Sequence, residues 1–444
     1  MTFVRAFSTP DLRKKLLFTA GMIVLFRFGS YLPTPGVSQA DVKHCSGLAS
    51  ASGTGAASVL AVLNVLSGNS LLRLSVFALN VMPYITASII LQLLTQAVPR
   101  LQALKLEGRA GQAKITQYTR YLTVGLAVVE SASYIALARD GRLFPGTDCT
   151  ATSYPLIPHP SAFTLATMLV TMVSGTAVIM WMGELITDRG IGNGMSVVLF
   201  TSVLAVIPGQ LEQIYLTKKI GYAAMAVIVI IIVIGFVVFM EQAQRRIPVQ
   251  YAKRMHGRRM YGGTSTYLPV KLNQAGVVPV MFASSALYLP QLAASMFGDS
   301  SRPQGWVSWV NRYLSVTAAG PSFFYYVMFF LLIVGFAGFY VSITFNPSEI
   351  ADNMKKYGGF IPGIRPGQAT AGYLSYVLVR LTVPGAVYLA VIAMFPMVAL
   401  GLIGVGDQLL FSGVSLLIMV GVALDTLKQI ESQLQQRNYT GFLR

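Results

Sequence analysis

Apolar residues are gathered into ten long stretches that contain almost no charged side chains. The hydrocarbon core of a bilayer is about 30 Å thick and requires about 20 apolar residues for each spanning helix. The pattern therefore predicts an all-α polytopic membrane protein with ten transmembrane helices. The predicted spans are Leu16–Leu32, Leu74–Val98, Tyr121–Ala138, Ala162–Met182, Gly194–Ile207, Tyr222–Met240, Val277–Phe297, Phe323–Phe345, Leu381–Gly401 and Gln408–Leu424.

The composition agrees with this class and excludes several others. Hydrophobic residues make up 54% of the 444 residues and charged residues only 11%, whereas about 25% of an average soluble protein is charged. This deficit excludes a disordered chain, a nucleic-acid-binding module and an ordinary soluble enzyme. The net charge of +17 could still indicate a nucleic-acid partner, so its meaning depends on where the positive residues lie.

The Lys and Arg residues divide unequally between the two sides of the predicted bundle. The side that holds both chain ends carries 24 of them, and the opposite side carries 8. Cytoplasmic loops of membrane proteins have such an excess, so we predict that both termini are cytoplasmic. Much of the positive charge is then explained without a nucleic acid.

One segment on the outer side, residues 56–74, is too short to span a membrane. Val59–Leu66 is apolar, Ser67–Ser70 interrupts the pattern, and the pattern resumes around Arg73. Runs of this length are typical of re-entrant or interfacial elements, and non-helical backbone survives at membrane depth only inside protein or along a cavity. The segment is therefore either a re-entrant element in an internal cavity or an amphipathic helix on the outer surface.

Two long basic loops, 241–273 and 346–380, lie on the predicted cytoplasmic side. Basic loops can simply set topology or contact anionic lipid. These loops also interleave tyrosines with their cations, which suits docking onto an acidic or RNA-bearing partner. The candidate docking residues are Arg254, Arg258, Arg259, Lys355, Lys356 and Arg365.

Glu130 lies inside the third predicted span, where a carboxylate is a functional candidate by default. It could couple proton movement in a secondary transporter, but no second acidic residue accompanies it. We favour a polar contact between helices, with Asn273 or Asn80 as the partner. Gly404–Asp407 matches the Gly-x-Gly-Asp motif of intramembrane proteases, which need two carboxylates sharing a proton. No second span carries an aspartate to pair with it.

Other motifs of catalysis and ligand binding are weak. The three histidines lie far apart and form no metal-ligand motif, so we expect no metal, no cofactor and no catalytic residue. Gly190–Gly194 lacks the Gly-Lys-Ser/Thr of a phosphate-binding loop, and we interpret it as a tight turn into the fifth span. Cys45 and Cys149 both fall on the outer side, where a disulfide is permitted, but we expect free thiols.

Several motifs follow one another along nearly the whole chain. They are Met82–Ile90, Gln117–Tyr121, Gly183–Glu184 with Arg189–Gly194, Tyr251–Arg254, Leu268–Asn273 with Ala275–Val277, Phe345–Pro347, Pro362–Gly367 and Ser415–Ile418. In this order they resemble the SecY family of bacterial preprotein-translocase channel subunits.

The resemblance implies two inverted five-helix halves around an hourglass pore that can open sideways to lipid. The halves would be residues 1–207 and 220–444, joined by a hinge at 208–219. The segment at about 56–74 would be a plug, with Leu60, Leu63, Leu66, Asn69, Leu72 and Arg73 as its candidate residues.

The resemblance also implies a pore ring and a lateral gate. An apolar ring excludes water and ions by dewetting, and flexible side chains such as Met can seal around varied passing chains. The ring residues would be Val81, Ile85, Met195, Leu199, Met281 and Ile418. Spans two and three would face spans seven and eight at the gate. The candidate gate residues are Thr86, Gln92, Glu130, Asn273, Ser284 and Leu289.

The implied function is a channel that translocates unfolded preproteins across the bacterial cytoplasmic membrane and releases transmembrane segments into it. The implied partners are the small subunits SecE and SecG, the motor SecA, the ribosome, signal sequences and nascent chains, with SecD, SecF, YidC and anionic lipid as further candidates. The alternative is a secondary transporter with broken helices, which would need converging polar groups at the membrane midplane. Only Arg27 and Glu130 are obvious candidates for such groups.

Overall fold

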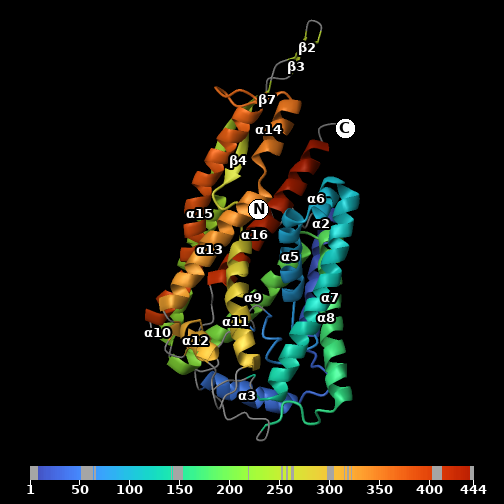
Figure 1. Ribbon diagram of the computed structural model, residues 1–444, viewed down its shortest axis with the longest axis vertical. Coiled ribbons are helices and arrows are strands. Elements are labelled where there is room, and N and C mark those ends of the chain that lie inside the picture. The colour runs from blue at the N-terminus through green and yellow to red at the C-terminus, as the bar shows by residue number, and fades with distance from the viewer. Residues whose placement is uncertain are drawn as a thin grey trace.

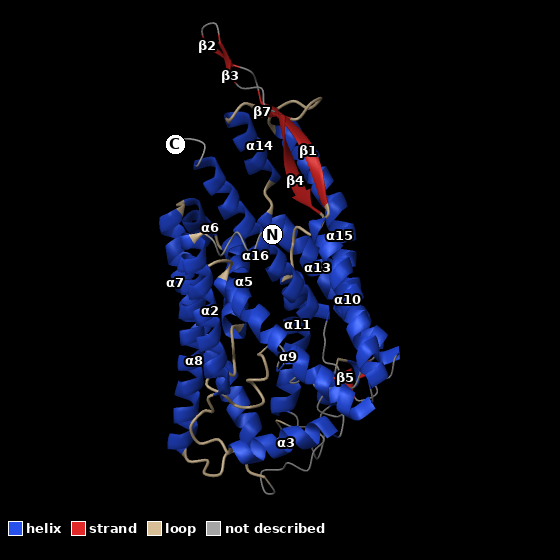
Figure 2. Cartoon of the chain, turned by 180° about the vertical axis from the view of Figure 1, so that it is seen from behind, coloured by secondary structure: helices blue, strands red, loops and turns tan. Residues whose placement is uncertain are grey.

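The computed structural model describes residues 9–51, 64, 67–141, 143, 154–218, 220–251, 254–256, 259–261, 265–297, 305–314, 316–317, 320–321, 323–402 and 413–440. Its helices run roughly alongside one another in an elongated bundle, with small strands at one end (Figures 1 and 2). The helices of the first part are α2 (Pro10–Tyr31), α3 (Gln39–Ala51), α5 (Met82–Ala97), α6 (Pro99–Leu106), α7 (Arg109–Arg139), α8 (Ala162–Arg189) and α9 (Gly194–Lys218). Those of the second part are α10 (Ile220–Gln242), α11 (Val278–Phe297), α12 (Gly305–Tyr313), α13 (Phe323–Thr344), α14 (Pro347–Lys356), α15 (Gln368–Leu402) and α16 (Gly413–Thr440).

The helical prediction is confirmed, because every predicted span contains part of a described helix. Seven described helices are long and apolar enough to cross a membrane, namely α7, α8, α9, α10, α13, α15 and α16. Shorter apolar stretches lie in α5 and α11, and α2 also coincides with a predicted span. The protein is therefore a multi-pass helical membrane protein, and the count of ten spans stays a prediction.

A small three-stranded sheet departs from the all-helical expectation. Strand β1 (Gln244–Tyr251) pairs antiparallel with β4 (Ser265–Lys271) and with β7 (Gly359–Phe360). Ile247 and Val270 of this sheet pack against Leu374 of α15, so the basic loop 241–273 is a hairpin seated on a helix. Beyond it, β2 (Arg254–His256) pairs with β3 (Arg259–Tyr261) at the far tip (Figure 1).

A further two-stranded hairpin joins β5 (Val316–Thr317) to β6 (Gly320–Pro321) between α12 and α13. Figure 1 shows α3 and α12 at the end of the bundle opposite the β2–β3 tip. The two ends of the molecule therefore carry different elements: the three-stranded sheet, the β2–β3 hairpin and α14 lie at one end, and α3, α12 and the β5–β6 hairpin lie at the other (Figure 2).

The central core is built where the two parts of the chain meet. Helix α9 packs against α8, α10 and α16, while α5 packs on α7 and α11 packs on α13. Fully buried side chains of this core include Ile179 of α8, Val203 of α9 and Leu416 of α16. The packing gathers α5, α9, α11 and α16 around one region, which contains the site described below.

The glycine-rich stretch between α8 and α9 is a tight turn, as the sequence predicted. A side chain on Gly194 would lie 1.8 Å from the carbonyl oxygen of Gly183, so only glycine lets the two helices approach this closely. The backbone N–H of Gly194 donates to Thr187 Oγ1 at 2.9 Å, and that of Gly192 donates to Gln429 Oε1 of α16 at 2.9 Å. The turn thereby fixes the start of α9 beside α8 and α16.

Candidate functional site: a cavity above an apolar cluster

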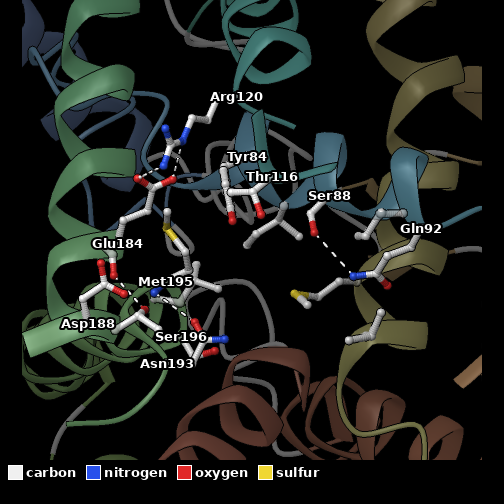
Figure 3. Close-up of a pocket in the computed structure, with 17 residues that line it drawn as sticks. Tyr84, Ser88, Gln92, Thr116, Arg120, Glu184, Asp188, Asn193, Met195 and Ser196 are labelled. Carbon is white, nitrogen blue, oxygen red and sulfur yellow. Dashed lines mark hydrogen bonds and ion pairs between the residues drawn. The ribbon is translucent and has the colours of Figure 1, made fainter. Parts of the chain in front are cut away.

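A cavity of about 470 Å³ lies among five helices, α5, α7, α8, α9 and α11 (Figure 3). Its lining residues are Tyr84, Ile85, Ser88, Ile89, Gln92, Thr116, Arg120, Gly183, Glu184, Thr187, Asp188, Asn193, Met195, Ser196, Leu199, Val278 and Met281. The first four of these helices come from the first part of the chain and α11 comes from the second. The cavity is therefore formed between the two parts of the chain.

One wall of the cavity is polar and contains an ion pair. Arg120 of α7 donates through Nε to Glu184 Oε1 and through Nη2 to Glu184 Oε2, both at 2.8 Å. Asp188 follows one helical turn after Glu184, and Tyr84 and Thr116 complete the wall (Figure 3). The wall can hydrogen-bond water or a peptide backbone from several directions.

The other lining is apolar and contains four of the six predicted ring residues: Ile85, Met195, Leu199 and Met281. Ile85 comes from α5, Met195 and Leu199 from α9, and Met281 from α11. The predicted i, i+4 spacing on α9 does place two ring residues on the same side of that helix. The cavity is therefore polar along one wall and apolar along another.

The remaining two ring residues are buried beside these four. Val81, at the N-cap of α5, is 1% exposed, and Ile418 of α16 is 3% exposed. Neither lines the cavity, but both belong to the same apolar cluster as Met195 and Leu199. This cluster is the main core and extends through most of the long helices, so membership places the six residues in the same core, and their action as a ring stays a prediction.

A turn-rich segment, residues 67–80, packs against this cluster through Phe77. Asn69, Leu74 and Asn80 have positive φ angles of 66°, 48° and 52°, which non-glycine residues adopt only when the surroundings hold them there. The Oδ1 of Asn64 accepts from the backbone N–H of Leu72 at 3.1 Å, and the Nδ2 of Asn64 donates to Asn69 Oδ1 at 2.9 Å. This part of the segment is buried in protein, unlike a helix on the membrane surface.

Three of the predicted plug residues are described, and three are not. Asn69 accepts a hydrogen bond from Asn64. Leu72 packs against a second apolar cluster, which includes Leu74 and Met172. The guanidinium carbon of Arg73 lies 4.8 Å from the ring centroid of Tyr31 in α2. Leu60, Leu63 and Leu66 lie outside the described residues.

The segment is joined to α9 at Ser202. The side-chain amide of Asn80 donates to Ser202 Oγ at 2.9 Å, in a fully buried contact. Gly68, with a φ of +72°, lies so close that a Cβ there would be 3.2 Å from Ser202 Cα and 3.1 Å from Arg27 Nη1. Ser202 lies one turn beyond Leu199, so the same helix carries ring residues and the residue that holds the segment.

Three of the predicted gate residues, Thr86, Ser284 and Gln92, hydrogen-bond within their own helices. Thr86 and Ser284 hydrogen-bond carbonyl oxygens of their own helices, and Gln92 donates to Ser88 Oγ at 3.4 Å. Among the described residues, these three form no hydrogen bond with one another, with Glu130 or with Asn273. Leu289 is in α11, but its side chain lies outside the described set.

The expected contact of Glu130 with Asn273 or Asn80 is wrong. Asn273 donates to the Glu241 carboxylate at 2.5 Å, at the junction between α10 and the strands. Asn80 instead reaches Ser202. Within the described part of the chain, Glu130 has no hydrogen bond or ion pair, because both amides lie beside other helices.

The predicted docking residues lie together at the end of the molecule that bears the strands. Lys355 and Lys356 end α14, and Arg365 is exposed in the turn between β7 and α15. Arg254 and Arg259 lie in β2 and β3 of the projecting tip (Figure 1), and Arg258 lies outside the described residues.

The expectation of free thiols is wrong. The buried Cys45 of α3 is disulfide-bonded. The other cysteine in the sequence, Cys149, lies outside the described residues. His44 next to Cys45 also stacks on Tyr154, with ring centroids 4.5 Å apart, so α3 is held to the loop before α8.

Sequence reasoning missed the polar wall. Arg120 and Glu184 both lie in stretches, Gln117–Tyr121 and Gly183–Glu184, that carried the family resemblance, but they received no role. The signal available was a pair of opposite charges at the ends of two adjacent spans. The residues that hold the buried segment, Asn64 and Ser202, gave no such signal, because a lone polar residue in an apolar stretch is common.

Comparisons with known proteins agree on one family. The sequence model of the SecY family matches residues 75–427. The protein translocase subunit SecY of Streptomyces coelicolor is 56% identical over 449 aligned residues, which cover 100% of this chain and 99% of the relative.

Solved structures show the same fold at low sequence identity. A structure described as a protein-conducting channel has a TM-score of 0.62 at 17% identity, covering 95% of this chain and 92% of the other. Sec61 in a canine ribosome–channel complex has a TM-score of 0.60 at 16% identity, with 95% and 92% covered.

Proposed function

The chain belongs to the SecY family, and we propose that it is the channel subunit of a bacterial protein translocase, which moves unfolded polypeptides and performs no chemistry itself. The observation that carries this proposal is the cavity between the two parts of the chain, which ends on apolar residues of several helices. A passing polypeptide needs such a path, with a polar vestibule for its backbone and an apolar constriction that excludes ions when the path is closed.

We assign the constriction to Val81, Ile85, Met195, Leu199, Met281 and Ile418. Their side chains are all apolar, and they come from four separate helices. Small outward movements of those helices would widen the constriction without breaking any hydrogen bond, because apolar side chains have none to lose. Two of the six are Met, which adapts to side chains of different shape.

We assign the segment around residues 56–74 as the plug on the outer side. Its described part lies mostly inside the protein, contains strained backbone at Leu74, and contacts α9 through Gly68 and Ser202. A segment held by a few polar contacts and strained dihedrals can leave its site at low cost once those contacts break. This supports a removable cover rather than a structural element.

The lateral gate would lie between α5 and α7 on one side and α11 and α13 on the other. Helix α5 packs on α7, and α11 packs on α13, so each side can move as a pair. A signal sequence is itself an apolar helix, which can replace the contact between the pairs and leave into lipid. The two moving parts would be residues 1–207 and 220–444, with the hinge at 208–219.

The docking surface would be the end that carries β1–β4, α14 and Arg365. The exposed Arg365 lies in a Pro- and Gly-containing turn, and Arg254 and Arg259 belong to the projecting β2–β3 hairpin. Cations placed in this way suit an acidic or RNA-bearing partner. SecA and the ribosome are the proposed partners there, with SecE and SecG as small membrane subunits. This end and both termini would be cytoplasmic, since it carries the excess of Lys and Arg.

Reconstituted transport tests the function. The full chain, purified in mild detergent with its co-purifying subunits, is placed in vesicles with SecA, ATP and a preprotein. The proposal expects protease-protected preprotein only when the chain and ATP are both present. Protection that does not depend on the chain, or a lone dimer that accumulates a small solute instead, would favour the secondary-transporter alternative.

A further inference from the structure

Helix α12 (Gly305–Tyr313) carries two neighbouring apolar faces, which lie about 100° apart around its axis. Val307 and Val310, with Leu314 just after the helix, are 3%, 6% and 6% exposed and belong to the central core. Trp306, Trp309 and Tyr313 follow the same spacing of three and four residues on the other face, and they are 43%, 48% and 37% exposed. A short helix with a fully apolar inner face and an exposed aromatic outer face is not a typical solvent-exposed loop helix.

The aromatic face lies where α13 begins its span. The ring centroid of Phe324 is 6.0 Å from that of Trp309 and 5.8 Å from that of Tyr313. Phe324 is in the first turn of α13, a helix apolar enough to cross a membrane from Phe323 onward. Phe323 is itself 84% exposed. The aromatic face is therefore continuous with the lipid-facing surface of α13, at the level where that surface starts.

The chemistry of this face fits the interface between lipid and water. Tryptophan and tyrosine rings concentrate at the headgroup level, where one part of the ring is apolar and the other can hydrogen-bond. Arg312 lies beside them, with its guanidinium carbon 5.9 Å from the Tyr313 ring centroid, and an arginine there can reach lipid phosphates. Exposed to water, the same surface would be an uncompensated apolar patch.

We propose that α12 is an interfacial anchor, whose Trp306, Trp309 and Tyr313 lie in the phospholipid headgroup layer of the outer leaflet. This function is separate from the transport of polypeptides. Helix α12 packs on α11, so the anchor would hold the outer end of α11 at a fixed depth in the membrane.

Tryptophan fluorescence tests the anchor directly, because the chain has only three tryptophans. Trp181→Phe combined with either Trp306→Phe or Trp309→Phe leaves one reporter on α12. A matched deep control carries Leu331→Trp in a background with all three tryptophans replaced by Phe. Leu331 is 59% exposed on α13 and lies eight residues beyond Phe323, about 12 Å deeper at about 1.5 Å per residue.

Each variant is reconstituted as the full chain in phosphatidylcholine–phosphatidylglycerol vesicles. Quenching of the tryptophan fluorescence is then measured with three quenchers: lipids brominated close to the headgroup, lipids brominated deep in the acyl chain, and aqueous iodide. We expect the α12 reporters to be quenched more by the shallow lipids than by the deep ones and only weakly by iodide, and the Leu331→Trp reporter to show the reverse lipid preference. Strong iodide quenching without lipid quenching would mean that the face is open to water, and quenching by none of the three would mean that protein covers it. Either result would overturn the proposal that α12 is an interfacial anchor.

Discussion

Arg120 and Glu184 form a bidentate ion pair that joins α7 to α8 at the wall of the cavity, with both nitrogen–oxygen distances at 2.8 Å. The guanidinium and carboxylate planes match in this geometry, which makes such pairs stronger than single contacts. The pair is partly open, with side chains 48% and 24% exposed, so solvent weakens it. We estimate a coupling of about 1 kcal/mol.

Breaking this pair should lower the melting temperature in a non-additive way. Arg120→Ala and Glu184→Ala should each destabilise the protein, and the double variant should melt no lower than the worse single variant. Thermal melts followed by size-exclusion fluorescence in detergent provide the measurement. The neighbouring change Thr116→Ala is the control, because its hydroxyl donates only within α7. Fully additive losses would show that the two residues act independently.

Loss of the Ser202 hydroxyl should loosen the buried segment. Ser202→Ala removes the acceptor of the Asn80 amide, and an unmade buried hydrogen bond costs about 1–3 kcal/mol. If the segment covers the closed channel, resting ion conductance of reconstituted protein should rise roughly tenfold, since about 1.4 kcal/mol corresponds to a factor of ten.

Thr201→Ala is the matched control for Ser202→Ala, because the Thr201 hydroxyl donates to the Val197 carbonyl of its own helix. It should leave the conductance unchanged. Equal conductance in the two variants and the parent chain would show that the Asn80–Ser202 contact does not help to keep the channel closed.

The disulfide should be detectable as a covalent link between Cys45 and Cys149. Non-reducing digestion is expected to yield one peptide pair joined at these residues, and a bulky maleimide should react only after reduction. The bond would close a loop of roughly 100 residues, for which chain entropy alone predicts a stabilisation of up to about 4–5 kcal/mol.

Reduction should therefore lower the melting temperature of the parent chain. The double variant Cys45→Ser/Cys149→Ser should melt at the lower temperature with or without reductant. Maleimide labelling of unreduced protein, or an intermolecular link between two chains, would contradict the intrachain bond.

A reversed charge at Arg365 should block engagement of the motor without unfolding the chain. Arg365 is exposed in the turn before α15, where its carbonyl accepts from Thr370 Oγ1 at 2.9 Å. Because only the side chain changes, Arg365→Glu should keep the turn and lose SecA-driven transport in vesicles. The control is Arg139→Glu, at the last residue of α7, and this variant should transport normally. Normal transport by both variants would remove Arg365 from the docking surface.

The positions of the helices could be predicted because burying backbone in lipid requires long apolar runs. Their ends could not. Helix α7 begins at Arg109 and α15 at Gln368, well before the predicted starts at Tyr121 and Leu381, because both helices continue into water through residues that contain no proline. Hydropathy marks the membrane boundary and not the end of the helix.

The hairpin of β1 and β4 was missed for a different reason. Its signal was the alternation of the buried Ile247 and Val249 with exposed residues, which is short, contains Pro248 and lies in a strongly basic stretch. The ring residues came from the family resemblance, and the sequence alone could not distinguish them from other apolar residues in apolar helices. The contacts of Asn80 and Asn273 depend on how helices distant in sequence pack, which hydropathy does not encode.

A polypeptide in transit should pass between the residues assigned to the constriction. A transport intermediate that carries one cysteine can be arrested in reconstituted vesicles containing Leu199→Cys or Met281→Cys. Both positions line the cavity, and the native Cys45 is already bonded. The matched controls are Leu204→Cys and Leu331→Cys, which lie on α9 and α13 and are 45% and 59% exposed.

Oxidative cross-linking of the arrested polypeptide to these four variants is the most direct test. The account predicts disulfide-linked products at Leu199→Cys and Met281→Cys that depend on SecA and ATP, and none at Leu204→Cys or Leu331→Cys. Cross-links at the two control positions with none at the cavity positions would place the polypeptide outside the proposed constriction and contradict the account.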